Sequence, residues 1–295
     1  MHNAVIRIAA SFVCAALFFE AQAFAQLTKL NVGYVGITSD NAAAFIARDT
    51  GIYARNGLDV QLIYFNSGTT AVTALITGET PISQTAGPGV INATMNGSDT
   101  VMIASGNVTL DYWMLSRPEI KTPEQLKGGA VAISRFGSAS DLIVRYALQR
   151  LGLTPVKDVA ILQVGSLTER LAAMETKRVQ ATVLAPPAMY QAQTRGFNML
   201  VDIAALGLPY QATGVATTRK FIRERTDTVR RYIKAHIEAV HRFKTDRETS
   251  MRVLAKSLAL SDKQLLERTY DGAIAEHKLP AKQYPTLEGL KTILA

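Results

Sequence analysis

The chain has 295 residues and a formal net charge of +8; 48% of its residues are hydrophobic and 19% are charged. These proportions are typical of a soluble globular protein with one or two domains. The one cysteine, Cys14, lies in an N-terminal segment that we expect to be removed. This excludes a catalytic thiol, a disulfide and a thiolate metal site from the mature protein. Lysine and arginine are scattered, so the charge predicts a solvated basic surface that is compatible with an anionic ligand, and no nucleic-acid-binding stripe.

The first 25 residues have the pattern of a signal peptide. Arg7 precedes an apolar run over residues 8–19, and the small residues Ala23 and Ala25 fit cleavage before Gln26. The alternative is a retained membrane anchor, but the run is shorter than the roughly 20 apolar residues that a membrane span needs. We therefore expect residues 1–25 to be removed and the protein to be exported.

Strand-like and helix-like segments alternate along the rest of the chain. In the first part, strands are predicted over residues 29–36, 58–65, 81–86, 100–106 and 110–116, and helices over 40–57, 70–78 and 88–97. After a capping box at residues 122–125 the alternation starts again, with strands over 129–134, 159–165 and 181–187, helices over 140–153 and 167–179, and one further helix and strand within 190–203. From Val229 onward the pattern is helical only.

This alternation predicts parallel βαβ units and an α/β fold. The break near Arg117 predicts a second lobe inserted into the first. Residues 26–117 and 211–295 would form lobe 1 and residues 118–210 lobe 2, each a mostly parallel sheet flanked by helices. Open α/β sheets bind ligands beyond the carboxyl ends of their strands. Two such lobes joined by a two-strand link therefore predict a ligand cleft that closes by a hinge motion.

Loops that follow the strands of lobe 1 supply the candidate ligand-binding residues of one wall. These are Thr38, Ser39, Asp40, Ser67, Gly68, Thr69, Thr85, Ala86 and Gly87. A strand, a Gly/Ser turn and a helix in succession present backbone N–H groups to an anion or a polar ligand. Ser67 and Thr69 are equally suited to capping their own helix, and Asp40 is more typical of a helix cap than of a ligand contact.

The opposite wall is predicted from the loops of lobe 2 and from the return crossing. Its candidate ligand-binding residues are Arg135, Gly137, Ser138, Ala139, Ser166, Pro186 and Tyr210. Arg135 is the only cation in these loops and is suited to pair with a carboxylate, a sulfonate or a nitrate; a surface arginine on the loop rim is the alternative. Ser166 also caps its own helix. Trp113 fits core packing better than stacking on a ligand.

The sequence predicts no metal site and no catalytic group. His236 and His241 lie five residues apart, whereas a helical metal pair prefers a spacing of four. The predicted cleft loops contain no histidine and the mature chain no cysteine. We therefore expect a binding protein that needs no cofactor and is not an enzyme.

Four stretches, in this order and spacing, carry a resemblance to a known family: GIYARNGLDVQLIYFNSGTTAVTALITGE, IKTPEQLKGGAVAI, GSASDLIVRYALQRLGLTPVKDV and AAMETKRVQATVLAPP. They resemble the periplasmic substrate-binding proteins of the nitrate/sulfonate/taurine class of ABC importers, the SsuA/THI5-like and NMT1-like proteins. The resemblance covers nearly all of the mature chain. Pro81 stands where the family usually has Asp, and Lys177 and Gln180 stand where it has Gly and Asp; these positions lie near turns.

The resemblance implies a type II periplasmic-binding fold, capture of a small molecule in the periplasm, and its delivery to an inner-membrane permease and the ATPase of that permease. We expect a monomer that binds no nucleic acid. Small oxyanions, alkyl or aryl sulfonates, aromatic carboxylates and pyrimidines all fit as ligands. Two alternatives use the same scaffold. One is an enzyme that makes a thiamine pyrimidine precursor, whose cysteine-rich motif is missing here; the other is a sensor that presents its ligand to a different membrane partner.

Overall fold

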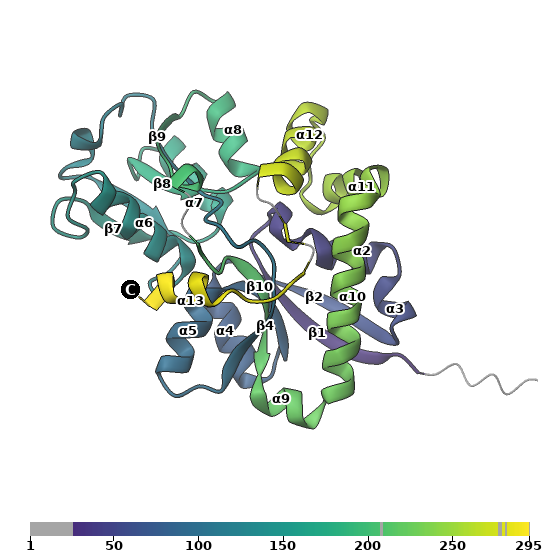
Figure 1. Cartoon of the computed structure of the whole chain (residues 1–295). Helices are drawn as coiled ribbons and strands as arrows, with labels where there is room; N and C mark the ends of the chain where they lie inside the picture. The colour runs from purple at the N-terminus through teal and green to yellow at the C-terminus, as the bar shows by residue number, and fades with distance from the viewer. Residues whose placement is uncertain (1–25, 207–208, 277–278, 281, 295) are drawn as a thin grey trace, which may run out of the picture.

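The computed structural model describes residues 26–206, 209–276, 279–280 and 282–294, so the predicted signal peptide lies outside the described residues. Two five-stranded sheets, each covered by helices, lie one above the other in Figure 1 and are joined by two crossing segments. We call the sheet that contains the first strand, with its helices, the first lobe, and the other sheet with its helices the second lobe.

The first sheet has the strand order β2-β1-β3-β10-β4. Its strands are β1 (Thr28–Val35), β2 (Leu58–Phe65), β3 (Ile82–Ala86), β4 (Thr100–Ser105) and β10 (Thr213–Thr218). The strands β1, β2 and β3 pair in parallel, and β10 is antiparallel to both of its neighbours, β3 and β4. Four strands therefore run in one direction and β10 runs against them. The sequence pattern predicts no strand at β10, which is the first strand after the return from the second lobe.

The second sheet has the same arrangement, with the strand order β7-β6-β8-β5-β9. Its strands are β5 (Trp113–Ser116), β6 (Ala130–Ile133), β7 (Ala160–Gln163), β8 (Ala181–Leu184) and β9 (Asn198–Asp202). Here β5, the first strand after the crossing, is antiparallel to β8 and β9. The sequence pattern predicts that the first segment of lobe 1 ends at Arg117. The pairing of β5 puts residues 113–116 in the second sheet instead.

Helices cover both sheets (Figure 1). Those of the first lobe are α2 (Ala42–Asp49), α3 (Ile52–Arg55), α4 (Gly68–Thr77), α5 (Gly87–Met95), α9 (Arg219–Glu224), α10 (Thr226–Thr245), α11 (Arg247–Ser257) and α12 (Lys263–Asp271), with the 3-10 turn η1 (Ser39–Asn41) and the π-helical turn η4 (Gly272–Glu276). Those of the second lobe are α6 (Ala139–Arg150), α7 (Leu167–Glu175) and α8 (Ala188–Thr194), with the 3-10 turns η2 (Pro123–Leu126) and η3 (Ala204–Leu206). A last helix, α13 (Leu287–Leu294), follows an extended segment.

The single helix predicted over residues 40–57 is divided in two. Gly51 has a φ of +71°, in the left-handed region that favours glycine, and it lies between α2 and α3. The Thr50 hydroxyl donates to the Ile46 carbonyl and occupies an acceptor at the end of α2. Gly51, which lies inside the single helix predicted from the sequence, is therefore the position where the chain turns.

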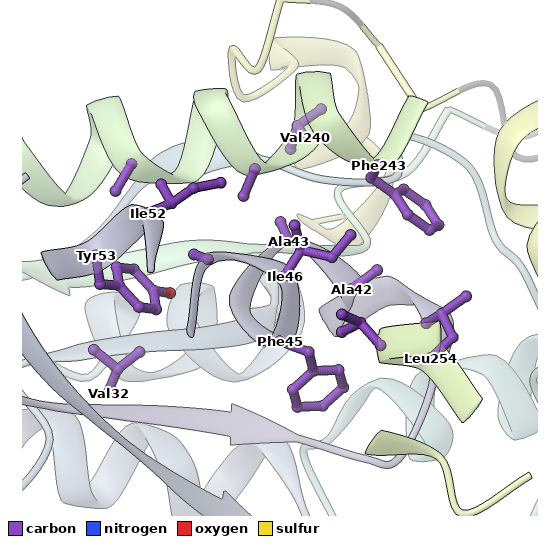
Figure 2. Packing of buried hydrophobic residues seen from close by; sticks show 14 of the residues in the cluster. Val32, Ala42, Ala43, Phe45, Ile46, Ile52, Tyr53, Val240, Phe243 and Leu254 are labelled. Carbon is purple, nitrogen blue, oxygen red and sulfur yellow. The ribbon is translucent and has the colours of Figure 1, made fainter. Parts of the chain in front are cut away.

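The core of the first lobe lies between its sheet and the helices α2, α3, α10 and α11 (Figure 2). In Figure 2, Ile46 lies on the side of α2 that faces Val240 and α10, whereas the ring of Phe45 points away from α10 toward the sheet. There it packs edge-on against the ring of Tyr34 of β1, with the centroids 5.3 Å apart. The rings of Tyr53 and Tyr232 stack with their centroids 5.7 Å apart. The long helix α10 therefore holds α2, and with it the chain that leads to the cleft, against the sheet.

The two crossing segments run antiparallel between the sheets. The Tyr210 N–H donates to the Val108 carbonyl at 3.0 Å, and the Ala212 N–H donates to the Asn107 carbonyl at 3.2 Å. The segment before α13 lies against them, because the Ser105 N–H donates to the Gln283 carbonyl at 2.8 Å. The crossing segments are thus held by backbone hydrogen bonds to each other and to the C-terminal part of the chain.

Helix α13 can lie against the return crossing because it has a glycine there. A Cβ atom at Gly289 would lie 2.6 Å from both the Gln211 nitrogen and the Tyr210 carbonyl carbon. We expect Gly289→Ala to displace α13 and to lower the free energy of unfolding by about 1–3 kcal/mol. Chemical denaturation and the rate of limited proteolysis within residues 284–294 measure this. Glu288→Ala, an exposed neighbour, is the control; equal behaviour of the two variants would contradict close packing of α13.

His236 of α10 is buried behind the crossing segments. Neither ring nitrogen makes a hydrogen bond of good geometry with a described residue. Burial lowers the pKa of His236 to about 4, although the Gln283 side chain and the Ser105 backbone lie near enough to oppose the shift. At neutral pH the imidazole is therefore uncharged.

This shift predicts acid sensitivity. Between pH 6.5 and 4 the unfolded chain binds a proton at His236 that the folded chain does not, so the free energy of unfolding falls as the pH falls. From pH 7.5 to 5.0 the expected loss from this residue is about 2 kcal/mol. Urea unfolding at both pH values should show that His236→Gln loses less stability than the wild type. His241→Gln, an exposed control, should keep the full loss; a wild-type pH dependence in His236→Gln would refute this.

Candidate functional site

A cavity of about 60 Å³ lies where the two lobes meet. It is lined by residues of both lobes: Val35, Gly36, Thr38, Asp40, Asn66, Gly68, Ala86, Gly89, Tyr112, Ser134, Ala139, Ser140, Ser166, Leu167, Arg170 and Thr213. Gly36 and Asn66 directly follow β1 and β2, and Ser134 directly follows β6. The cavity therefore lies beyond the carboxyl ends of parallel strands on both sides, as expected for α/β sheets.

Four helices begin at this cavity. The first residues of α4 and α6, Gly68 and Ala139, line it, and so do the N-cap residues of α5 and α7, Ala86 and Ser166. The first N–H groups of a helix have no partner within the helix, and its dipole makes this end positive. Two helices from each lobe thus direct their positive ends toward one small volume.

Two of these helices, α4 and α7, are capped by the serines Ser67 and Ser166, which were among the predicted site residues. The Ser67 hydroxyl accepts from the Thr70 N–H at 3.3 Å. Ser166 and Glu169 form a capping box, in which the Ser166 hydroxyl accepts from the Glu169 N–H and the Glu169 carboxylate accepts from the Ser166 N–H. The capping role considered for both serines is therefore confirmed. Ser166 also lines the cavity, whereas Ser67 does not.

Arg170 is the one lining residue with a full positive charge. Its side chain is 3% exposed, and its Nη1 donates to the Val183 carbonyl at 2.7 Å and to the Thr182 hydroxyl at 3.3 Å. Its Nε is buried without a hydrogen-bond partner, and among the described residues no carboxylate pairs with it. Burial lowers the pKa of Arg170 to about 10, so the guanidinium still carries its charge at neutral pH.

Arg170 is not among the site residues predicted from the sequence, because it lies in a helix and the prediction considered cations in loops. Arg170 lies in the first turn of α7, on the face that buries Leu167, Leu171 and Met174. The signal available in the sequence was a charged residue on an apolar helix face. The residue three positions before Arg170 and the residues one and four positions after it are all apolar. Most arginines at such positions reach solvent with their charged end. Arg170 does not.

Two tyrosines lie near the guanidinium. Tyr112 lines the cavity; burial raises the pKa of its hydroxyl to about 12, and the positive charge of Arg170 opposes the shift. Burial also raises the pKa of Tyr64 on β2, while a hydrogen bond with the Ser166 side chain lowers it. Both phenols are therefore protonated at neutral pH. Tyr64 belongs to the first lobe and Ser166 to the second, so this contact crosses the cleft.

Asp40 connects the cavity to the crossing segments. The Asn107 amide donates to its Oδ1 at 2.6 Å, and the Thr213 hydroxyl donates to its Oδ2 at 3.3 Å. Asn107 belongs to the outgoing crossing, and Thr213 begins β10 just after the return. Asp40 is the middle residue of η1, and the N-cap residues of η1 and α2 are Thr38 and Asn41. The position of Asp40 thus differs from the helix cap considered for it, and its carboxylate accepts hydrogen bonds from both crossings.

Two further hydrogen bonds join the rims of the lobes. The Thr69 hydroxyl donates to the Phe136 carbonyl, and the Asn92 amide donates to the Gly137 carbonyl, each at 3.2 Å. Thr69 and Asn92 lie on α4 and α5 of the first lobe, while Phe136 and Gly137 precede α6 of the second. The lobes are therefore closed against each other around the cavity.

The structure distributes the sixteen predicted site residues as follows. Six line the central cavity: Thr38, Asp40, Gly68, Ala86, Ala139 and Ser166. Four line neighbouring pockets. Arg135 lines a pocket of about 190 Å³ that also includes Asn66 and Ser134. Thr69 and Gly137 line a second pocket of about 190 Å³ between α4 and α5, and Ser39 lines one of about 20 Å³ beside His236. The remaining six line none of these: Ser67, Thr85, Gly87, Ser138, Pro186 and Tyr210.

Several of the residues outside the central cavity have a clear structural place. Arg135 is exposed at the rim, and Tyr210 is buried in the core of the second lobe. Ser138 shares a hydrogen-bonded cluster with Ser134 and Ser140. Trp113 is buried in the second lobe, as expected from core packing. The described residues contain no cluster of histidine and carboxylate side chains that could hold a metal ion, and no helix among them is long and apolar enough to cross a membrane.

Several known proteins are similar to this chain in sequence or in structure. A protein of Brucella abortus that carries the name of a binding protein is 24% identical over 277 residues, which cover 87% of this chain and 85% of the relative. The alkanesulfonate-binding protein SsuA of Xanthomonas axonopodis pv. citri, solved with bound MOPS, has a TM-score of 0.76 at 19% identity and covers 91% of this chain and 90% of its own. The nitrate-binding protein NrtA of Synechocystis PCC 6803 has a TM-score of 0.71 at 15% identity, with 90% and 75% covered.

These structural likenesses show the fold, which is the two-lobed fold of periplasmic binding proteins, as the resemblance implied. The family model described as the NMT1-like family matches residues 24–259. That match extends from the start of the described chain through both lobes to α11. The chain therefore belongs to the NMT1-like family.

Proposed function

We propose that this protein is a solute-binding receptor of an ABC importer and holds one small molecule in the cavity between its lobes. The observation that carries the proposal is the cavity itself, which is lined from both lobes and closed by hydrogen bonds between them. The names of the relatives and structural neighbours, binding proteins for sulfonate and nitrate among them, support it. An inner-membrane permease with its ATPase is the proposed partner, and the periplasm the proposed location.

We propose binding as the activity because Tyr112 and Arg170, two titratable groups that line the cavity, each keep one protonation state at neutral pH. The raised pKa of Tyr112 keeps its phenol protonated, and Arg170 stays charged. A general acid or base works best with a pKa near the ambient pH, which neither group has. Both groups are instead suited to fixed hydrogen bonding with a ligand.

The proposed mechanism is closure of the two lobes around the ligand. A ligand shifts an equilibrium between open and closed forms only by its differential affinity for them. Contacts from both walls are available only when the lobes meet, so a ligand that touches Ser134 and Gly68 together favours the closed form. The rim hydrogen bonds of Thr69 and Asn92 add to the stability of that form.

The direct test is a thermal-shift screen of the protein, without residues 1–25, against short-chain sulfonates, carboxylates, nitrate, pyrimidines and neutral amides. A ligand at a hundred times its Kd adds about 2.7 kcal/mol to the free energy of unfolding. We expect at least one solute to raise the Tm, and small-angle X-ray scattering to show a more compact protein with it. A broad panel without any shift would remove the receptor function.

The rim contacts give a sharper prediction. Asn92→Ala removes the bond to the Gly137 carbonyl without changing a residue of the central cavity. The loss of one hydrogen bond present only in the closed form should weaken the binding of the screened solute about twofold to tenfold, measured by calorimetry. Asn96→Ala is the matched control, because the Asn96 amide bonds only to the Asn92 carbonyl in its own helix region. Equal effects of both changes would argue against a role of the rim in closure.

A further inference from the structure

We infer that Arg170, and not Arg135, binds the charged end of the ligand, and that the ligand is a small organic anion. This inference rests on the proposed receptor function and names the chemical class that its cavity takes. It starts from the position of the one buried cation in the cavity wall. Three observations carry it: the unused edge of the guanidinium, the missing counter-charge and the composition of the rest of the wall.

The first observation is geometric. Nη1 of Arg170 is engaged by Val183 and Thr182, and no hydrogen bond joins Nε or Nη2 to a described residue. In a guanidinium, Nη1 lies on the side of Cδ, so Nε–H and Nη2–H point the same way along the opposite edge. Two parallel N–H donors match two oxygens of a carboxylate or a sulfonate. The second lobe thus fixes one side of Arg170, and the N–H groups along the other edge have no partner among the described residues.

The second observation concerns charge. A buried ion without a partner loses its hydration, and the free energy of folding becomes less favourable as a result. None of the ion pairs observed among the described residues includes Arg170. Asp40 lines the same cavity, but its two oxygens accept from Asn107 and Thr213. An anion in the cavity would supply the counter-charge that the chain does not.

The third observation is that the rest of the wall has an apolar part. Val35, Leu167 and the ring of Tyr112 line the cavity together with the small residues Ala86 and Ala139. An inorganic oxyanion has no carbon to place against these side chains, whereas a short carbon chain is stabilised there by about 0.8 kcal/mol per buried CH₂. The ligand class is therefore an organic carboxylate or sulfonate with a short apolar part.

Arg135 is the less suitable cation for this role. It is exposed and lines the pocket at the rim, which adjoins the central cavity through Asn66 and Ser134. Glu169 lies close to this rim, and its carboxylate would oppose a second anion there. An exposed ion pair contributes little because water and salt screen it. Arg135 is therefore expected to affect the rate of anion capture more than the affinity.

The test compares butanoate and butane-1-sulfonate with nitrate and with neutral butanamide, by calorimetry on the protein without residues 1–25. Truncating one partner of a desolvated charge pair usually costs 2–5 kcal/mol, which is about 30-fold or more in affinity. We expect Arg170→Met to lose the organic anions by at least this factor. Arg170→Lys, which keeps the charge and loses the bidentate edge, should lie between Arg170→Met and the wild type. Butanamide and nitrate should bind more weakly than butanoate to the wild type.

Arg135→Ala is the matched control and should change the affinity for the anions less than threefold. The free energy of unfolding of each ligand-free variant shows whether it is folded; Arg170→Lys keeps the test decisive if Arg170→Met is not. Unchanged anion binding in a folded Arg170→Met, or equal binding of butanamide and butanoate to the wild type, overturns the inference. In that case a neutral solute that still raises the Tm leaves the receptor function standing. If no solute binds at all, the receptor function itself falls.

Discussion

The carboxylate of Asp40 holds both connections between the lobes at one point. One oxygen accepts from Asn107 in the outgoing crossing, and the other accepts from Thr213, where the chain re-enters the first sheet. The crossings also bond to each other, so under the proposed closure of the lobes they form the hinge, and Asp40 is hydrogen-bonded to both of them. Asp40 stands just after β1, at the edge of the cavity. The proposed hinge and the central cavity therefore share a residue, which would let a ligand beside Asp40 act on the hinge directly.

The placement of β5 and β10 follows from the same constraint. Each is the first strand after a crossing, and each runs against the other four strands of its sheet. An antiparallel entry lets the chain leave a crossing and join a sheet without a helical connection, which a parallel entry would need. The remaining strands then keep a common direction, and their carboxyl ends face the other lobe. The four helices that begin at the cavity are a consequence of this arrangement.

Much of this architecture could be predicted from the sequence because its signals are local. The strand predicted over residues 58–65 is β2 with the same bounds, and the capping box of Ser166 marks the start of α7. The features that were missed depend on distant partners. β10 has the sequence TGVATT, which has no run of large apolar residues, and it is a strand because β3 and β4 pair with it on both sides. Arg170 looks like any arginine near a helix start; only the positions of Thr182 and Val183 make it a buried cation.

Under the proposed function, the burial of Arg170 makes the closure of the lobes depend on whether an anionic ligand is bound. Val183 and Thr182 satisfy one nitrogen whether the lobes are open or closed, because all three residues belong to the second lobe. The Nε and Nη2 edge of the guanidinium is different, because opening the lobes would admit water to the cavity, and this water would hydrate the edge. Closure removes that water, so closure without a ligand leaves a guanidinium edge desolvated, while closure around an anion replaces water by a charged partner. Under this proposal we expect the empty receptor to favour the open form and an anion to favour the closed form, with the same side chain responsible for both preferences.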